Sequence, residues 1–194
     1  MSQHTDISEP RATRSDGQRS RTAILDAAAA LATIDGLEGL SIGDLAGRTG
    51  MSKSGLYAHF KSKEELQIAI VDHAAVIFAA EVVRPGHARG EGLALLRGLA
   101  DTFLDHLERR VFPGGCFFAS VGAEFDSRPG RVKQRVLEFI NTWMAELVAA
   151  AAQAQARGEI TSEIDAEQVA WEVDALLLMA HAAFVMTEIG RAHV

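Results

Sequence analysis

The chain has 194 residues, 48% of them apolar and 23% charged, with a single cysteine and a formal net charge of -7. The length allows one core of ordinary size or a small module joined to a larger one, and the composition excludes a disordered or collagen-like chain. One cysteine excludes an internal disulfide and a zinc cluster built from cysteines alone, and it favours a reducing compartment.

The charge is unevenly distributed along the chain. Residues 11–63 carry eight basic residues against five acidic ones, which gives +3, whereas residues 64–194 carry -8. A basic N-terminal third on an acidic remainder is typical of a small phosphate-facing module attached to a larger body. The acidic total therefore does not exclude a nucleic acid as a partner.

The N-terminal third predicts short helices with marked starts. Residues 1–16 are polar and contain no apolar stretch of a secretory signal, so we expect a flexible tail and a cytoplasmic protein. A first helix is predicted over about 19–34. Ser41, Ser52 and Ser62 each mark a further helix start, because a serine hydroxyl caps free backbone N–H groups. This pattern indicates a helix-turn-helix in a three-helix module, with an ordinary small helical bundle as the alternative.

The rest of the chain also has a helical period, and the predicted fold is all-α. The helix that begins at Lys63 should continue to about residue 83 and end before Pro85. Later helices are expected over about 92–110, 116–125, 131–156 and 165–189, the last with a capping box of Asp165 and Gln168. The longest apolar run, residues 175–186, is shorter than the roughly 20 residues that span a bilayer, so it predicts a buried helix and no membrane contact.

Residues 40–66, LSIGDLAGRTGMSKSGLYAHFKSKEEL, closely resemble the DNA-binding domain of TetR-family transcriptional regulators. The matching features are the Ile-x-x-Leu-Ala of the second helix, the Gly-Met-Ser-Lys turn, the Leu-Tyr-x-His-Phe recognition helix and the Lys-x-Glu-Glu-Leu that follows it. Residues 21–28 look like the family's first helix, and the match covers roughly residues 17–66. Gly55 is a departure, since the family more often has Thr, Ala or Ser there, and glycine weakens a helix interior by about 1 kcal/mol.

The recognition helix has the two sides that DNA binding requires. Leu56 and Phe60, four residues apart, are expected to face the core, which leaves polar and basic side chains pointing outward. The resemblance implies phosphate contacts from Tyr57, His59 and Lys63, and base contacts from Lys53 and Ser54. Arg21 lies where the first helix begins and suits a contact with the DNA backbone. Ser52 can meet a phosphate at the helix N-terminus, and Ser41 and Ile42 begin the supporting helix beside the same strand. Taken singly, each of these side chains has an ordinary alternative as a packed or solvated residue.

The resemblance also implies a C-terminal body for dimerisation and ligand binding. The last helix is apolar nearly all round, so one side suits the core of its own subunit and another suits a partner in a four-helix dimer interface. The expected dimer contacts are Leu147, Trp171, Leu178, Ala182, Val185 and Ile189. The expected pocket for a small-molecule effector is lined by His73, Phe78, Phe103, His106, Phe117, Phe118, Phe139, Trp143 and Met144, although each of these residues also suits a plain core.

The sequence gives weaker support to an enzyme, a metal site or a redox sensor. Residues 39–43 fit the Gly-x-Ser-x-Gly pattern of hydrolases, but that motif needs a preceding strand, and Ser41 is better explained as a helix cap. The histidines and Cys116 lack the close spacing of metal sites, so we expect no metal and no cofactor. Cys116 suits either an oxidant sensor near a helix start or an inert buried thiol beside Phe117.

The sequence thus predicts a homodimeric, non-enzymatic transcriptional regulator, most simply a repressor that a small-molecule effector releases from a palindromic operator in double-stranded DNA. The expected organisation is a tail (1–16), a helix-turn-helix DNA-binding domain (17–66, its fourth helix continuing to about 83) and a ligand-binding and dimerisation domain (67–194). The alternative is a redox- or metal-responsive helical sensor, or an interaction protein, without sequence-specific DNA binding.

Overall fold

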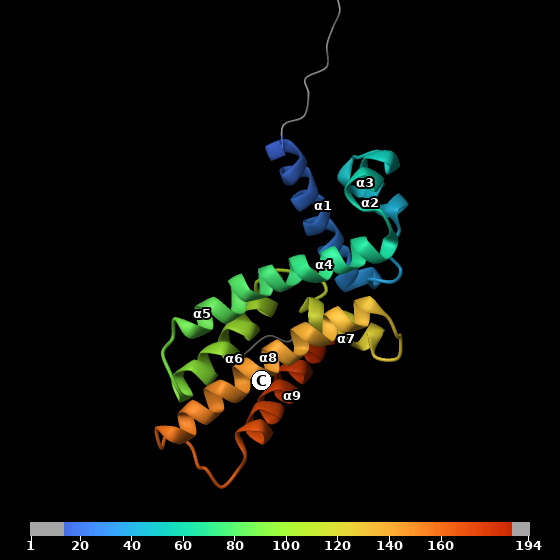
Figure 1. Cartoon of the computed structure of the whole chain (residues 1–194). Coiled ribbons are helices and arrows are strands. Elements are labelled where there is room, and N and C mark those ends of the chain that lie inside the picture. Colours follow the sequence, from blue (N-terminus) through green and yellow to red (C-terminus); the bar gives the residue numbers. More distant parts are fainter. Residues whose placement is uncertain (1–13, 188–194) are drawn as a thin grey trace, which may run out of the picture.

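A computed structural model describes residues 14–187, which are helical and contain no strand (Figure 1). The elements are α1 (Arg14–Asp35), α2 (Ile42–Thr49), α3 (Lys53–His59), α4 (Lys63–Phe78), a π-helical segment η1 (Ala79–Val83), α5 (Arg84–His87), α6 (Leu93–Glu108), α7 (Phe117–Phe125), α8 (Arg131–Ala156) and α9 (Ala166–Thr187). In Figure 1, α1–α3 form a head at one end, and α4 runs from that head into a body made of α5–α9. The predicted all-α fold is confirmed.

Serine caps define the helices of the head as the sequence predicts. The hydroxyls of Ser41, Ser52 and Ser62 each accept a hydrogen bond of 3.1 Å from a backbone N–H three residues later. Gly50 ends α2 in the left-handed conformation, with a φ of 66°, which glycine adopts without steric cost. The sequence therefore identifies the helix-turn-helix correctly.

The first and the last helix differ from the prediction at their starts. α1 begins at Arg14, five residues before the expected start at 19, so the expected tail overlaps the helix, and residues 1–13 lie outside the described part of the chain. At the start of α9, Asp165 accepts from the N–H of Glu167, but Gln168 donates to Glu172 instead of completing a capping box. The end of α9 beyond Thr187, including Ile189, also lies outside the described residues.

The helix that starts at Lys63 does not end before Pro85. It continues through η1 into α5 and ends at His87. The π-helical segment shifts the hydrogen-bond register, and Pro85 falls in the first turn of α5, where its missing N–H costs little. The buried Gly86 then allows close packing on α6, because a Cβ at this position would lie 2.7 Å from the side chain of Leu99.

The last helix is not buried as its apolar run predicts. Its inner face packs on α8 and α6 through Ala170, Leu177 and Ala180, whereas Leu176 and Met179 are exposed. By length and composition, two helical stretches among the described residues are apolar enough to cross a membrane, Lys63–His87 and Ala166–Thr187. The first contributes buried side chains to the core, and the second carries an apolar face that the protomer leaves uncovered.

Candidate nucleic-acid interface and ligand cavity

The recognition helix α3 divides its residues between core and solvent. Leu56 and Phe60 are buried, as the spacing predicts, and they hold the helix against the head. Lys53 and Ser54 lie on the exposed side together with Tyr57, whose side chain is 56% exposed. A large aromatic residue that is left in solvent on a seven-residue helix has little packing role in the protomer, so it suits an external contact.

A hollow of about 400 Å³ lies in the head beside α3. It is lined by Ser41, Ile42, Lys53, Tyr57 and Lys63, together with Gly39, Leu40 and Gly43. The structure therefore brings five of the nine predicted DNA-contact residues to one concave surface, from α2, α3 and α4. Two of these residues are lysines, and the N-termini of α2 and α3 add the positive ends of helix dipoles.

The other four predicted contact residues lie outside this hollow. Ser52 caps α3, and its hydroxyl lies 3.0 Å from that of Ser54. The half-buried His59 lies beside the ring of Phe60, while the guanidinium of Arg21 lies 4.9 Å from the centre of the same ring. Phe60 therefore positions a basic side chain of α1 next to the end of the recognition helix.

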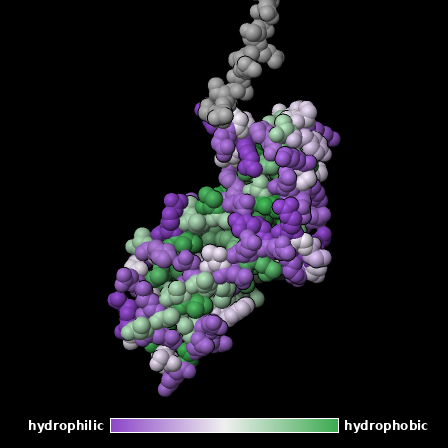
Figure 2. Space-filling model, viewed as in Figure 1, coloured by the Kyte–Doolittle hydropathy of each residue, from purple (hydrophilic) through white to green (hydrophobic). Residues whose placement is uncertain are grey.

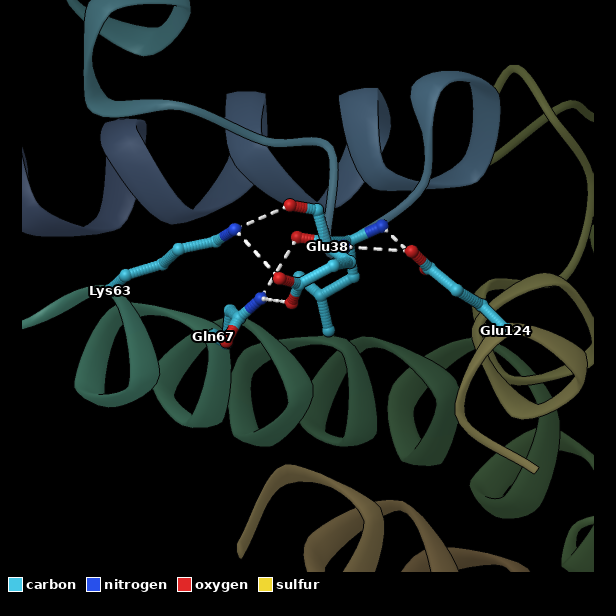
Figure 3. A network of polar contacts seen from close by, with 5 residues as sticks. Glu38, Lys63, Gln67 and Glu124 are labelled. Atoms are coloured by element: carbon cyan, nitrogen blue, oxygen red, sulfur yellow. Dashed lines mark hydrogen bonds and ion pairs between the residues drawn. The ribbon is translucent and has the colours of Figure 1, made fainter. Parts of the chain in front are cut away.

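Lys63 is held by an acidic partner that the sequence did not reveal. Its Nζ donates to the carboxylate of Glu38 at 3.0 Å and to the carbonyl of Glu38 at 2.6 Å (Figure 3). The buried Gln67 donates to the second carboxylate oxygen of Glu38 at 2.8 Å. The hydrogen bond from Gln67, followed by that from Lys63, lowers the pKa of Glu38. Glu38 thus stays ionised and fixes the lysine at the edge of the hollow.

The loop between α1 and α2 is also tied to the body through α7. The carboxylate of Glu124, in the last turn of α7, accepts hydrogen bonds from the backbone N–H groups of Leu37 at 2.7 Å and Glu38 at 2.9 Å (Figure 3). Just before α7, in the loop that follows α6, the N–H of Gly114 donates to the hydroxyl of Thr33 at 3.0 Å. A Cβ at Gly114 would lie 2.0 Å from the carbonyl oxygen of Thr33, so only glycine fits this approach. Helix α7 and the loop before it therefore both connect to the head.

A cavity of about 260 Å³ lies in the body between α7, α8 and α9. Five of the nine predicted pocket residues line it: Phe78, Phe103, Phe118, Phe139 and Trp143. The rest of the wall was not predicted from the sequence and consists of Cys116, Ala119, Gly122, Ala123, Ile140, Asp174 and Leu178. Small residues at helical spacing on α7, Ala119, Gly122 and Ala123, leave this space, and the sequence alone does not indicate it.

The four remaining predicted pocket residues do not line this cavity. His73 lies against α1, where its Nε2 is 2.6 Å from the carboxylate of Asp26. Phe117 is fully buried in the core, and Met144 packs against that core. His106 is buried between Phe78 and Phe112, and neither of its ring nitrogens has a hydrogen-bond partner. Burial lowers the pKa of His106 to about 4.

A second cavity, of about 330 Å³, lies on the other side of Phe78, Phe139 and Trp143. Its remaining walls come from α4, η1 and α8, where Figure 2 shows apolar residues gathered on the surface of the body. Arg135 and Glu138 at its rim form an ion pair at 2.6 Å. The shared aromatic residues thus separate two adjacent spaces within the body.

The thiol of Cys116 faces the first cavity but is not activated. Cys116 is buried at the N-cap of α7, and burial raises the pKa of its thiol to about 11. A thiol with such a pKa is almost wholly protonated at neutral pH, which disfavours the oxidant-sensor reading. Among the described residues, no group of three or more His, Cys, Asp or Glu side chains is placed to hold a metal ion.

The exposed face of α9 contains three of the predicted dimer contacts. Trp171 is 62% exposed, and Leu178 and Val185 are about half exposed, while Ala182 is half-buried beside them. Leu147 was expected at the dimer interface, but its side chain is fully buried inside the protomer, so it cannot touch a partner. Periodicity had placed Leu147 on the apolar stripe of α8, and the structure shows that α8 turns that stripe inward.

Two family models match the chain. The model described as "Bacterial regulatory proteins, tetR family" matches residues 24–70, and the model described as "Tetracyclin repressor-like, C-terminal domain" matches residues 92–193. A search among curated proteins gave no significant match.

Solved structures share the fold over most of the chain. A TetR transcriptional regulator from Chloroflexus aurantiacus J-10-fl is 29% identical, with a TM-score of 0.82, and the match covers 90% of this chain and 88% of that one. A TetR-family regulator from Cytophaga hutchinsonii is 24% identical (TM-score 0.79; 95% and 90% covered). AibR, solved in complex with isovaleryl coenzyme A and operator DNA, is 23% identical (TM-score 0.71; 84% and 86% covered). At these sequence identities, the similarity to the last two proteins shows only a shared fold.

Proposed function

The chain belongs to the TetR family of bacterial transcriptional regulators, and from this premise we propose that it is a homodimeric repressor that a small effector releases from a palindromic operator. Members of this family are DNA-binding regulators with a C-terminal ligand-binding domain, and they are typically not enzymes. The observation that carries the proposal is the concave surface of the head, where Lys53, Tyr57 and Lys63 converge with two helix N-termini. We place the protein in the cytoplasm, where it reaches the chromosome.

On DNA, the exposed side of α3 enters the major groove. Lys53 and Ser54 lie at the N-terminal end of the recognition helix, which is the end that reaches base edges in helix-turn-helix proteins. Tyr57 and Lys63 contact phosphates on one side of the groove, and Ser41 with the N-terminus of α2 contacts the same strand. Arg21 and His59, positioned around Phe60, contact the backbone at the other end of α3.

Dimerisation through α8 and α9 supplies the second head. The exposed apolar face of α9 is the surface that a partner would cover, and this role accounts for its composition without a membrane. A two-fold dimer presents two recognition helices to half-sites about one DNA turn, or a multiple of it, apart. AibR, which has the same fold, was crystallised with both a ligand and its operator, an arrangement in line with this division of roles.

Helix α7 connects the cavity to the head. Its middle residues, Ala119, Gly122 and Ala123, line the cavity. Gly114, just before the helix, holds Thr33 of α1, and Glu124, in its last turn, holds the loop between α1 and α2. A ligand that moves α7 therefore also moves the loop of Leu37 and Glu38. Because Glu38 holds Lys63, the movement reaches the DNA-contact surface through two hydrogen-bonded steps, from Glu124 to Glu38 and from Glu38 to Lys63.

DNA selection tests the head. We expect the protein to enrich one palindromic sequence from a random or genomic pool, and we expect Lys53→Ala and Tyr57→Ala each to weaken binding to it by about tenfold or more in a gel-shift assay. Lys61→Ala is the matched control, since Lys61 is exposed but does not line the hollow. Unchanged affinity in both head variants would overturn the assigned roles. No enrichment of any sequence would favour a helical interaction protein instead.

A double-mutant cycle tests the α7 connection. Ala119→Leu fills part of the cavity and imitates a ligand, so it should change operator affinity by several-fold in the otherwise unchanged protein. In a Glu124→Ala background, the same substitution should have little effect, because the carboxylate that holds Leu37 and Glu38 is gone. Glu163→Ala, an exposed change outside the helices, is the control background. Equal effects in the Glu124→Ala and Glu163→Ala backgrounds would exclude this route.

A further inference from the structure

One carboxylate lies in the otherwise apolar wall of the 260 Å³ cavity. Asp174, on α9, is partly buried, and its Oδ1 accepts a hydrogen bond of 2.8 Å from the indole N–H of Trp143. Within residues 14–187, no lysine, arginine or histidine forms an ion pair with it. Burial raises the pKa of Asp174, which means that the protein environment disfavours its charge. A carboxylate kept at such a position is stabilised when a cation binds beside it.

The walls around Asp174 are aromatic. Phe103 and Trp143 lie nearly parallel, with ring centres 6.5 Å apart, whereas Phe118 and Phe139 stack directly on each other and form one part of the wall together. Aromatic faces attract organic cations through the ring quadrupole, most strongly when water is excluded. The cavity thus combines a cage of aromatic rings with one counter-ion, and its volume suits a small effector.

No positive charge balances this carboxylate from the surrounding groups. The residues that line the cavity include no lysine or arginine. Burial lowers the pKa values of both His106 and His181, and burial raises that of Cys116, so all three are neutral near pH 7. In the adjacent cavity, Arg135 is already bound to Asp72 and Glu138. An anionic ligand would meet Asp174 without compensation.

We propose that this cavity binds an organic cation, an amine or a quaternary ammonium group on a small aromatic or aliphatic body, with Asp174 as its counter-ion and the aromatic side chains as its cage. The inference rests on the proposed function and deepens it, because it gives the effector a chemical class.

Matched ligands test the proposal by calorimetry on the full-length protein without DNA. Benzyltrimethylammonium and neopentylbenzene have nearly the same shape and differ by one positive charge, and 3-phenylpropionate supplies a negative one. We expect the cation to bind at least about tenfold more tightly than the neutral compound, and the carboxylate to bind more weakly than either. Asp174→Asn keeps an acceptor for Trp143 and removes the charge, so it should reduce the preference to about twofold or less.

Three results would overturn the proposal: equal binding of the cation and the neutral compound, no binding of the cation, or a preference that survives in a folded Asp174→Asn variant. The ligand comparison on the unaltered protein decides the matter even where the variant is unstable. Failure here is separate from failure of the proposed function. Operator selection without cation binding removes only the ligand class, and cation binding without any operator removes only the DNA-binding role.

Discussion

At the scale of single residues, the buried imidazole of His106 is the most unusual group in the body. It lies edge-on to Phe78 and Phe112, with no hydrogen-bond partner at either nitrogen. Its pKa of about 4 is depressed mainly by burial, with a smaller opposing effect from Glu81. Since the unfolded chain takes up the proton near the ordinary value of 6.5, acid favours the unfolded state.

This pKa predicts a pH dependence of stability. The stability linked to His106 is fully present above about pH 6.5 and is lost progressively as the pH falls toward 4, with about 2 kcal/mol lost between pH 7 and pH 5. His106→Phe, which keeps a ring between Phe78 and Phe112, should remove this part of the loss. Urea unfolding at pH 7 and pH 5 measures the difference. Equal pH dependence in both proteins would show that the imidazole is not buried as described.

His181, whose pKa is also lowered by burial, acts in the same direction and remains in the variant. Glu38, with a lowered pKa, loses its contribution only at more acidic pH, and Asp174, with a raised pKa, acts in the opposite sense. The difference between the two proteins, rather than the total slope, therefore reports on His106.

At the scale of elements, α9 carries an apolar face that its own subunit does not cover. Trp171 and Met179 are 62% and 65% exposed. If this face joins two subunits, Trp171→Asp or Met179→Asp places a carboxylate in an apolar interface and should convert the dimer to a monomer in light scattering. Val76→Asp is the control, because Val76 is 66% exposed on α4, away from α9. A dimer that withstands both α9 substitutions would exclude this face.

Local sequence patterns predict some features of the helices and not others. The serine caps at Ser41, Ser52 and Ser62 were predictable, because each hydroxyl bonds a backbone group only three residues away. The continuation of the helix past Pro85 was not predictable, because it depends on a π-helical segment that leaves no clear sequence signal. The orientation of Leu147 failed for a related reason: periodicity marks apolar faces but does not say what covers each of them.

The contacts of the candidate site likewise include some that the sequence predicts and some that it does not. Leu56 and Phe60 were correctly expected in the core from their spacing on one short helix. Glu124 was missed because its partners are backbone N–H groups 86 and 87 residues away, which no local pattern can indicate. Asp174 was missed because a single acidic residue in an apolar helix looks like an ordinary solvent-facing position until α8 is packed against it.

At the scale of the whole molecule, the distribution of charge and the dimer together set the salt dependence of DNA binding. Each phosphate neutralised by the protein adds about 0.9 to the slope of log affinity against log salt concentration. A monomeric Trp171→Asp variant brings one head instead of two, so its slope on the operator should be about half that of the dimer. Fluorescence anisotropy at several salt concentrations measures both slopes. An undiminished slope in the monomer would mean that DNA itself brings the heads together.

The ion pair between Lys63 and Glu38 also bears on how the protein searches a genome. While Glu38 holds the ammonium group, the head offers random DNA one cation fewer than its composition suggests. If Lys63 contacts a phosphate as proposed, competition from Glu38 shortens residence on non-operator sequences. On the operator, where the neighbouring contacts fix the backbone close to Lys63, a phosphate competes with Glu38 for the same ammonium group. The same competition weakens the operator contact, so the ion pair lowers the overall affinity for DNA and does not by itself raise the ratio of specific to non-specific occupancy.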